Sequence, residues 1–378
     1  MSNPVRVLQV FAEMNRGGAE TMIMNLYRNI DRSKIQFDFI VHTEVKCAFD
    51  DEINKLGGRI FRIPKYKGIN HITYLKNWEH FFKIHPEYKI VHGHVRSTAS
   101  IYLKAAQKYG LTTIAHSHNT SSGSGISAIA KSVLQYPIRY VADYLFACSE
   151  AAGEWLFGKQ ACKKGNFHIL NNAIDVRKFI FNNDIRDRKR KEFQLEGKFV
   201  IGHVGRFHPQ KNHEFLIDIF KEVYEKNDNA VLLLVGEGNL QDSIQEKVYN
   251  LGLNSNVIFT GVRSDIPELF QVMDMFVFPS LYEGLGIVLI EAQASGLPCV
   301  VADTIPKEAL VTDNVEQVSL TKSPESWTGA IFQRIDKYER TSTFEEIKNR
   351  GYDIEESCMW LQEFYLGLVE LDETRFCN

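Results

Sequence analysis

The chain has 378 residues, of which 44% are hydrophobic, so it can form large cores, and at about 150 residues per domain two domains are expected. Its 44 basic and 47 acidic residues are well mixed and give a net charge of −3. This balance excludes the broad basic surface of a nucleic-acid-binding protein, so a polyanion must be bound by a local group of cations.

The amino terminus lacks the basic segment followed by about 7 to 15 apolar residues that a signal peptide needs. Nowhere does an apolar run approach the roughly 18 residues that a membrane span requires. Six cysteines are scattered without a C-x-x-C pair or a metal-like spacing, which is typical of reduced thiols. We therefore expect a cytoplasmic protein, and peripheral contact with the inner face of the cell membrane stays open.

Short apolar runs alternate with helical patterns through the first half. Strands are predicted in "VRVLQVF", "FDFIVH", "RIFRIP", "KIVHGH", "TTIAHSH" and "YLFACS", and helices at residues 19–29, at 49–56 and between the later strands. Continuous apolar strands separated by helices indicate parallel βαβ units with a sheet covered on both faces. The charge-dense stretch at 182–198, "NNDIRDRKRKEFQLEGK", has few core residues and is interpreted as a linker or a solvated helix.

The same alternation restarts after this stretch, with strands predicted in "FVIGHVGRF", "AVLLLVGEG", "NVIFTGV", "MFVFPS" and "PCVVAD". The last 30 or so residues have apolar positions at helical spacing and no strand. We therefore predict an α/β fold of two Rossmann-like, doubly wound domains at residues 1–180 and 181–352. Residues 353–378 are expected to form a helix that packs back on the first domain.

Ligands of open α/β sheets bind beyond the carboxyl ends of the strands, where loops and helix N-termini present free N–H groups. The first such loop is "MNRGGAE", in which Gly17 and Gly18 open a helix and let a phosphate approach the backbone. A plain strand-to-helix turn explains it equally well. Neither a G-x-G-x-x-G fingerprint nor a P-loop occurs, which disfavours nicotinamide and ATP chemistry.

The second unusual loop is "HVGRFHPQKN". Arg206 and Lys211 lie five positions apart in a loop that Pro209 makes irregular, so both cations can converge on one point. A forked guanidinium and a compact ammonium suit a diphosphate leaving group. The alternative is a pair of unrelated surface cations.

The third is "FPSLYEGLGIVLIEAQASG", which places Glu283 in a glycine-bearing loop after a strand and Glu291 early in a helix that opens near Ile287. Carboxylates in these places can accept hydrogen bonds from sugar and ribose hydroxyls on either side of a diphosphate at the helix N-terminus. For Glu291 alone, an interaction with the helix dipole is the competing explanation.

The fourth is "TTIAHSHNT". Period-two alternation puts His116 and His118 on the same strand face, and the sequence leaves open which of them faces a ligand. The pair "HGH" at 92–94 has the same ambiguity. We predict no metal site from any group of His, Cys and Asp residues.

Together these motifs resemble the retaining glycosyltransferases of the two-domain GT-B fold, family 4. The resemblance extends over nearly the whole chain, through "GGAE", "HSH", "LNNAID", "GRFHPQKN", "VGEG", "GVRSDIPELF" and "PSLYEGLGIVLIEAQASGLPCVVAD". It is strongest with bacterial enzymes that build exopolysaccharide or capsule repeat units. The resemblance implies two domains facing across a cleft, with the nucleotide sugar bound by the second domain and the acceptor by the first.

The family's motifs also imply residue roles. Arg206 and Lys211 would hold the departing diphosphate and neutralise its charge. Glu283 would accept hydrogen bonds from the donor sugar, and Glu291 from the nucleotide ribose. His118, which matches the family pattern better than His116, would lie near the sugar. The other donor-binding positions implied are Gly17, Gly18, Gly205, Gly236, Val262, Arg263, Gly284, Leu285, Gly286 and Ile287.

Retention in this family is attributed to departure and attack on the same face of the sugar, helped by the leaving diphosphate. Positioning and stabilisation of phosphate charge then carry the reaction, and no metal or other cofactor is expected. The expected donor is a UDP-linked hexose or N-acetylhexosamine, with guanosine an alternative carrier. The expected acceptor is a saccharide, and a saccharide linked to polyprenyl diphosphate is the candidate. "EWLFGKQACKK" at 154–164 is one candidate for a membrane contact, and a partly buried helix end is the alternative.

Two rival functions are compatible with the same fold. A sugar-nucleotide epimerase would convert the donor without an acceptor, although the sequence offers no additional carboxylates for proton abstraction. A non-catalytic subunit of a glycosyltransferase would keep the fold without the site. The joint presence of Arg206, Lys211, Glu283 and Glu291 disfavours it, because a scaffold has no need for that set.

Overall fold

The computed structural model describes residues 3–118, 132–336 and 338–376. The chain divides into two compact units, the first made of Met1–Ala173 with Asp353–Asn378 and the second of Ile174–Tyr352. The first boundary therefore lies earlier than residue 180, where the sequence placed it. Val176 and Phe179 explain the difference, because both side chains are buried in the core of the second unit.

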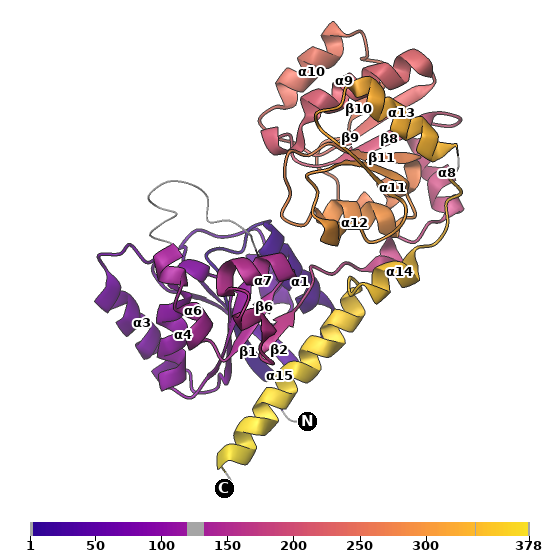
Figure 1. Cartoon of the computed structure of the whole chain (residues 1–378). Coiled ribbons are helices and arrows are strands. Elements are labelled where there is room, and N and C mark those ends of the chain that lie inside the picture. The colour runs from indigo at the N-terminus through magenta and orange to yellow at the C-terminus, as the bar shows by residue number, and fades with distance from the viewer. Residues whose placement is uncertain (1–2, 119–131, 337, 377–378) are drawn as a thin grey trace. The chain divides into compact units, whose positions relative to one another are not determined.

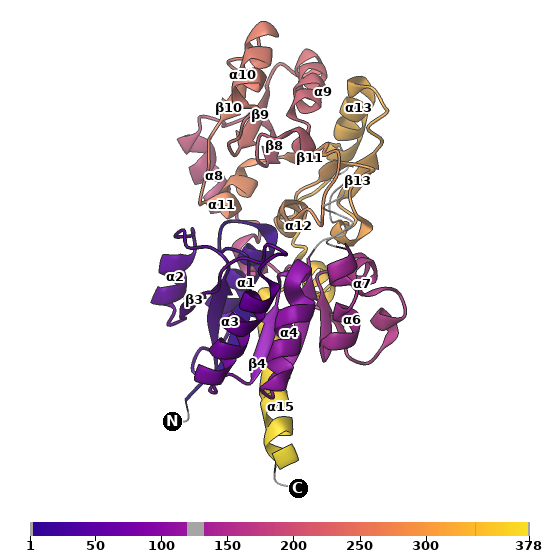
Figure 2. The ribbon, with the colours of Figure 1, turned by 90° about the vertical axis from the view of Figure 1, so that its left-hand side faces the viewer.

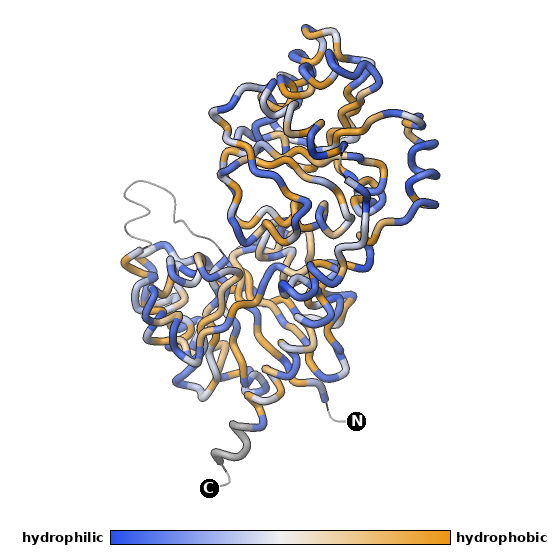
Figure 3. Tube along the Cα trace, turned by 45° about the vertical axis from the view of Figure 1, so that its right-hand side comes forward, coloured by the Kyte–Doolittle hydropathy of each residue, from blue (hydrophilic) through white to orange (hydrophobic). Residues whose placement is uncertain are grey.

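The first unit is a parallel sheet with the strand order β3-β2-β1-β4-β5-β6-β7 in the described residues. Its strands are β1 (Val5–Val10), β2 (Ile35–Val41), β3 (Ile60–Arg62), β4 (Ile90–Gly93), β5 (Thr112–Ser117), β6 (Tyr144–Ala147) and β7 (Phe167–Ile169). Its helices include α1 (Gly18–Asn29), α2 (Asp50–Lys55), α3 (His71–Ile84), α4 (Ala99–Lys108), α6 (Ile138–Val141), α7 (Glu150–Phe157) and α15 (Ile354–Phe376). Hydrophobic residues gather along the strands, as Figure 3 shows in orange.

The long C-terminal helix α15 belongs to this first unit. It packs against α1 and β2 (Figure 1). Leu361 and Tyr365 are fully buried in the same core as the first two strands. A helix with such an apolar stripe must bury it against another element, and the nearest apolar face is that of β1 and β2.

The second unit is a parallel sheet with the order β10-β9-β8-β11-β12-β13 in the described residues. Its strands are β8 (Phe199–Val204), β9 (Ala230–Val235), β10 (Val257–Phe259), β11 (Met275–Phe278), β12 (Cys299–Ala302) and β13 (Val315–Val318). Its helices include α8 (Asn183–Glu192), α9 (His213–Lys226), α10 (Gln241–Asn250), α11 (Ile266–Val272), α12 (Ile287–Ala294), α13 (Pro324–Ile335) and α14 (Phe344–Asn349). Figure 2 shows α9 and α13, which pack on each other. Strand β13 was not predicted, because its sequence "VEQV" at a sheet edge is only half apolar.

The charge-dense stretch interpreted as a linker is wrong as a linker. Helix α8 packs on α11, and two of its cations, Lys189 and Arg190, are buried in ion pairs. Arg190 is 9% exposed and contacts Asp274 at 2.5 Å, while Lys189 is 7% exposed and contacts Asp265 at 2.8 Å. Ion pairs with acidic residues far along the chain allow a highly charged helix to pack against a core.

Both sheets follow the order typical of doubly wound folds, with the direction of winding reversing beside the first strand. The reversal lies between β1 and β4 in the first unit and between β8 and β11 in the second. Loops at this point cannot cover each other, so a crevice opens there. Within the described residues, none of the helices is long and apolar enough to cross a membrane.

Candidate functional site

In the second unit, the two most unusual motifs come together at the point where the winding reverses. The loop after β8 is joined to the loop after β11 by hydrogen bonds to three backbone carbonyl groups. The Leu281 amide donates to the Gln210 carbonyl at 2.8 Å, the Gln210 side chain donates to the Tyr282 carbonyl at 2.9 Å, and the Asn212 side chain donates to the Pro279 carbonyl at 3.1 Å. Two motifs about 75 residues apart thus form one surface.

Lys211 and Glu283 form an ion pair at the centre of this surface. The distance from Lys211 Nζ to Glu283 Oε1 is 2.7 Å, and the two side chains are only 16% and 7% exposed. Gln210 donates to the other oxygen of Glu283 at 3.3 Å, and the ammonium of Lys211 lies 4.7 Å from the centre of the Phe278 ring. An ammonium has three donors, so Lys211 can keep Glu283 and still donate to a phosphate.

Arg206 has a different environment. It is exposed, and none of the described residues pairs with its guanidinium in a hydrogen bond or ion pair. Its strand neighbour Gly205 lies beside Lys211, since a Cβ at that position would stand 3.3 Å from the Lys211 side chain. The loop therefore carries one cation fixed by a carboxylate and one cation left open to a ligand.

Glu291 lies in α12, which begins at Ile287 as expected, after Gly286 in the left-handed conformation with φ 78°. A residue with a Cβ is strained in that conformation, so glycine is needed to turn the chain into the helix. Burial raises the pKa of Glu291 to about 7. Hydroxyl groups that donate hydrogen bonds to such a buried carboxylate stabilise its charged form, because these bonds offset the cost of desolvation.

The other positions predicted to bind the donor in this unit are glycines that shape the backbone and residues whose side chains are buried, exposed or already paired. The Gly236 amide donates to the Gly261 carbonyl at 2.9 Å, which ties the loops after β9 and β10 together. A Cβ at Gly236 would stand 2.2 Å from the Gly205 carbonyl oxygen, so this glycine also allows the loops to approach. Leu285 is buried, and Gly284 is exposed without a near contact.

Val262 and Arg263 lie at the outer end of this surface. Val262 is 60% exposed, whereas the guanidinium of Arg263 donates twice to Asp265, at 2.8 Å each. The Arg263 side chain is therefore engaged within its own loop. The backbone and the exposed Val262 side chain stay available to a nucleotide base, and the resemblance implies a contact with the backbone at this position.

In the first unit, Gly17 precedes α1 and Gly18 begins it. A Cβ on Gly17 would stand 2.2 Å from a carboxylate oxygen of Glu20, so the Glu20 side chain folds back over the start of the helix. Burial raises the pKa of this carboxyl group. A phosphate bound at this N-terminus would have to displace Glu20 or lie beside it, a complication that the sequence did not reveal.

The histidines of the first unit form a buried cluster. His116 and His118 stack with ring centres 4.0 Å apart, as period-two alternation requires. His118, just beyond the end of β5, keeps partial exposure, whereas His116 is 1% exposed. Of the two, His118 is the more exposed, although its Nδ1 atom is buried. His92 and His94 of the neighbouring strand complete the cluster, with the closest contact between His94 Nδ1 and His118 Nε2 at 2.7 Å.

Three of these histidines have ligand atoms within 4.8 Å of one another, which raises the question of a metal centre. The ring of His92 lies within 20° of parallel to that of His94 and within 16° to that of His116. In this structure the nitrogens of these rings are engaged in hydrogen bonds, His92 Nε2 with His116 Nδ1 at 3.1 Å and the two nitrogens of His94 with His118 and Gln9. The described cluster is instead arranged as a set of hydrogen-bonded, neutral rings.

Residues 154–164 do not present a membrane-binding surface. Leu156 and Phe157 are 3% and 1% exposed and pack in the core of the first unit. The Trp155 ring is covered by Arg96, whose guanidinium carbon lies 4.7 Å from the ring centre. The partly buried helix end is therefore the correct interpretation, because the apolar side chains of α7 face inward.

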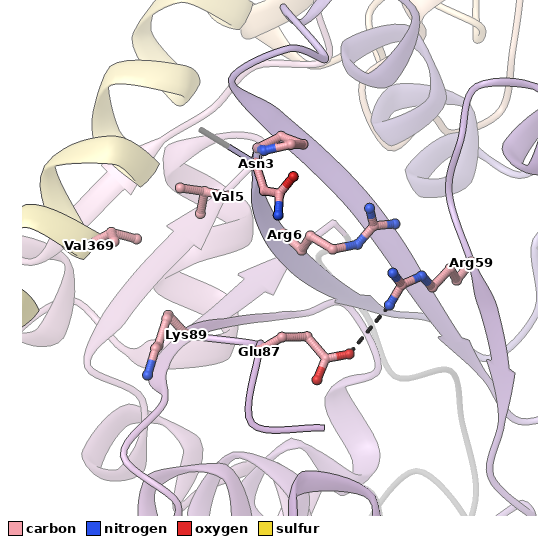
Figure 4. Close-up of a pocket in the computed structure, with 8 residues that line it drawn as sticks. Asn3, Val5, Arg6, Arg59, Glu87, Lys89 and Val369 are labelled. Atoms are coloured by element: carbon pink, nitrogen blue, oxygen red, sulfur yellow. Dashed lines mark hydrogen bonds and ion pairs between the residues drawn. The ribbon is translucent and has the colours of Figure 1, made fainter. Parts of the chain in front are cut away.

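A cavity of about 500 Å³ opens at the opposite edge of the first sheet (Figure 4). Its lining includes Arg6, Arg59, Lys89 and Glu87, and Arg59 donates to Glu87 at 3.3 Å. These residues lie at or before the amino ends of their strands. The cavity is therefore remote from the carboxyl-end loops that carry Gly17 and His118.

Two family models match the chain. Residues 16–178 match the model "Glycosyltransferase Family 4", and residues 184–350 match the model "Glycosyl transferases group 1". EpsF of Bacillus subtilis (strain 168), to which glycosyltransferase activity is ascribed, is 37% identical over 386 residues, covering 99% of this chain and 100% of EpsF. A UDP-Gal:alpha-D-GlcNAc-diphosphoundecaprenol alpha-1,3-galactosyltransferase of Escherichia coli is 24% identical, covering 82% of this chain and 84% of that enzyme.

The fold also matches solved structures. The Anabaena protein HepE in complex with UDP and glucose superposes with a TM-score of 0.74 at 19% identity, covering 96% of this chain and 100% of HepE. This likeness confirms the predicted architecture of two parallel-sheet α/β domains. Other relatives are named for capsular polysaccharide biosynthesis. The chain therefore belongs to the family 4 glycosyltransferases with the GT-B fold.

Proposed function

We propose that the protein transfers a hexose or N-acetylhexosamine from a UDP-sugar to a lipid-linked saccharide with retention of configuration, and that it needs no metal. The observation that carries this proposal is the pair of Lys211 and Glu283, held at the strand reversal of the second unit in the same loop as Arg206, which has no ion-pair partner among the described residues. Support for the donor comes from HepE, which was crystallised with UDP and glucose, and from the E. coli relative, named for UDP-Gal.

In this proposal the cations meet the departing diphosphate. Lys211, oriented by Glu283, donates to one phosphate, and Arg206 offers a forked guanidinium to the other. Negative charge grows on the bridging oxygen as the bond to the sugar breaks, so fixed positive charge stabilises the transition state more than the ground state. Two side chains then supply the charge that a divalent cation supplies elsewhere.

The carboxylates select the groups on either side. Glu283 keeps acceptor capacity beyond its bonds to Lys211 and Gln210, which we assign to a sugar hydroxyl. Glu291 is assigned to the ribose hydroxyls, and His118 to the neighbourhood of the donor sugar. The bond from the anomeric carbon to the diphosphate breaks while the acceptor oxygen attacks on the same face. The hydroxyl proton passes to the leaving phosphate oxygen.

The donor is tested by incubating the protein with a panel of UDP- and GDP-sugars and measuring nucleotide diphosphate release with and without a polyprenyl diphosphate-linked saccharide. We expect release of UDP from one sugar that depends on the acceptor, and an α-linked product if the donor is α-linked. Release of GDP alone would refute the donor, and an inverted product would refute retention. A new nucleotide sugar formed without acceptor would indicate an epimerase.

We also propose that a lipid-linked acceptor brings the first unit to the membrane. The segment between β3 and α3, together with the first turn of α3, offers the required chemistry. Ile69 and Ile72 are 96% and 70% exposed, and Lys65 and Lys67 are also exposed. Apolar side chains enter the interface, while lysines are attracted to anionic headgroups.

The membrane contact is tested by flotation with vesicles that contain anionic phospholipid. Replacing both Ile69 and Ile72 with Ser is expected to reduce the bound fraction. The matched control is Tyr249→Ser, which removes an equally exposed apolar residue (71%) on α10 of the second unit. Equal binding of all three proteins would count against this surface.

A further inference from the structure

The buried histidines of the first unit belong to one continuous chain of hydrogen bonds. His118 Nε2 lies 2.7 Å from His94 Nδ1, and His94 Nε2 lies 2.9 Å from Gln9 Oε1. From the other side of the same amide, Gln9 Nε2 lies 3.4 Å from the Tyr365 hydroxyl, which lies 2.6 Å from His92 Nδ1. His92 Nε2 then lies 3.1 Å from His116 Nδ1, which ends the chain.

Each ring in this chain can hold only one proton. Burial lowers the pKa of all four histidines, so each is neutral near pH 7 and has one N–H and one lone pair. A neutral ring that accepts a hydrogen bond at one nitrogen must donate at the other. The direction of donation is therefore the same from one end of the chain to the other.

The amide of Gln9 is the group that sets this direction. Its oxygen can only accept, so His94 must donate to it and must accept from His118. Its NH₂ group can only donate, so the Tyr365 hydroxyl accepts from it and donates to His92. Gln9 lies between the two halves of this chain of hydrogen bonds. Its side chain is fully buried, so water does not reach these hydrogen bonds.

We infer that Gln9 is a positioning residue that holds His118 as the Nε2–H tautomer, with an unshared lone pair on Nδ1 that we assign to a hydroxyl of the donor sugar. Within the described residues Nδ1 of His118 is buried and has no hydrogen-bond partner, and the same holds for Nε2 of His116 at the opposite end. The positive charge of Arg96 lowers the pKa of His118. The same charge favours the arrangement in which the free lone pair, rather than a free N–H group, lies on His118. Reversing the Gln9 amide would place that lone pair on His116 instead.

This inference rests on the proposed function for its role in catalysis, since it assumes that His118 meets the sugar. It restricts the contact to a group that donates a hydrogen bond, which a hydroxyl does and a carbonyl or ether oxygen does not. It also makes the C-terminal helix part of the site's support, through the hydroxyl of Tyr365.

The tautomer is measured directly by NMR of the ring nitrogens in protein labelled with ¹⁵N-histidine, with the His118 signals identified by their loss in His118→Asn. We expect a protonated Nε2 and an unprotonated Nδ1 in the unmodified protein. Gln9→Met keeps the side-chain volume but removes the acceptor, so His118 should populate both tautomers. Gln9→Glu keeps an acceptor toward His94 and should preserve the tautomer.

Tyr365→Phe is the matched control, because it removes a buried polar group from the other half of the chain and leaves the bonds from His118 to Gln9 in place. Its His118 signals should be unchanged. Gln9→Met is expected to lower kcat/KM for the donor by about tenfold, in line with outer residues that orient a site histidine, and Gln9→Glu to restore most of it.

A protonated Nδ1 on His118, or signals that ignore Gln9→Met, would overturn the inference whatever the enzyme's activity. If the tautomer responds as expected but kcat/KM does not, the chain of hydrogen bonds stands and the contact between His118 and the sugar is refuted. Should Gln9→Met fail to fold, a His118 tautomer that changes in Gln9→Glu would decide against the inference.

Discussion

The ion pair of Lys211 and Glu283 makes a prediction that separates stability from catalysis. Lys211→Met keeps the length of the side chain but leaves the carboxylate of Glu283, 7% exposed, without its cation. Removing one partner of such a buried pair costs about 3 kcal/mol. Loss of the contact between the ammonium and the Phe278 ring, 4.7 Å away, adds about 1 kcal/mol.

The double variant Lys211→Met with Glu283→Gln no longer buries a lone charge. It should regain the larger of these two contributions and remain about 1 kcal/mol less stable than the unmodified protein. Turnover should not recover, because the diphosphate still lacks its ammonium. We expect both variants to lose about 10²-fold or more in kcat.

Hydrogen exchange of the amides in β8 and β11 reports the unfolding free energy of the second unit by itself, and UDP release reports turnover. The matched control is Lys221→Met, which breaks the exposed pair of Lys221 and Glu225 on α9 and should cost less than about 0.5 kcal/mol without changing turnover. If the double variant is as unstable as Lys211→Met, the loss of stability does not come from burying the Glu283 carboxylate without its cation. Turnover like that of the unmodified protein would remove Lys211 from the site.

Arg206→Ala is expected to lower kcat by about 10²-fold with no loss of stability, since its guanidinium is exposed and unpaired among the described residues. The control is Arg188→Ala, which breaks a surface ion pair with Glu268 and should change neither kcat nor stability. Burial raises the pKa of Glu291 to about 7, so the carboxyl group becomes protonated as pH falls below that value, and KM for the donor should rise there by up to about tenfold per unit. In Glu291→Gln the KM should be independent of pH over the same range, and a parallel rise would refute the assignment. EDTA should leave turnover intact, and a loss that Mg²⁺ or Mn²⁺ restores would disprove the proposed metal independence.

Local patterns were sufficient to predict the architecture. Apolar runs of strand length separated by helical periodicity indicated two doubly wound sheets, and the start of α12 at Ile287 followed from a glycine-rich loop after an apolar strand. These features depend on residues near one another in the chain. The same holds for the loop motifs, because a parallel sheet brings all carboxyl ends to one edge.

Pairings between distant residues could not be predicted in this way. No local pattern indicates that Lys211 pairs with Glu283, or that α8 is anchored by Asp265 and Asp274. It also suggested that Leu156 and its neighbours could reach a membrane, although the helix turns them inward. Each of these outcomes depends on which face of an element meets another element.

The histidine cluster shows most clearly which features follow from the local sequence and which depend on tertiary packing. "HGH" and "HSH" both have the alternation of a strand, and two adjacent parallel strands would bring them together, so this was the one available signal for His92 and His94. Gln9 and Tyr365 carry no such signal, because they are 356 positions apart and meet only when α15 packs on the first sheet. Sequence by itself determined most of the strands, the loop motifs and the family resemblance. Tertiary packing decided which buried polar groups share a proton, since a hydrogen bond requires two atoms within about 3 Å and the chain order does not specify that distance.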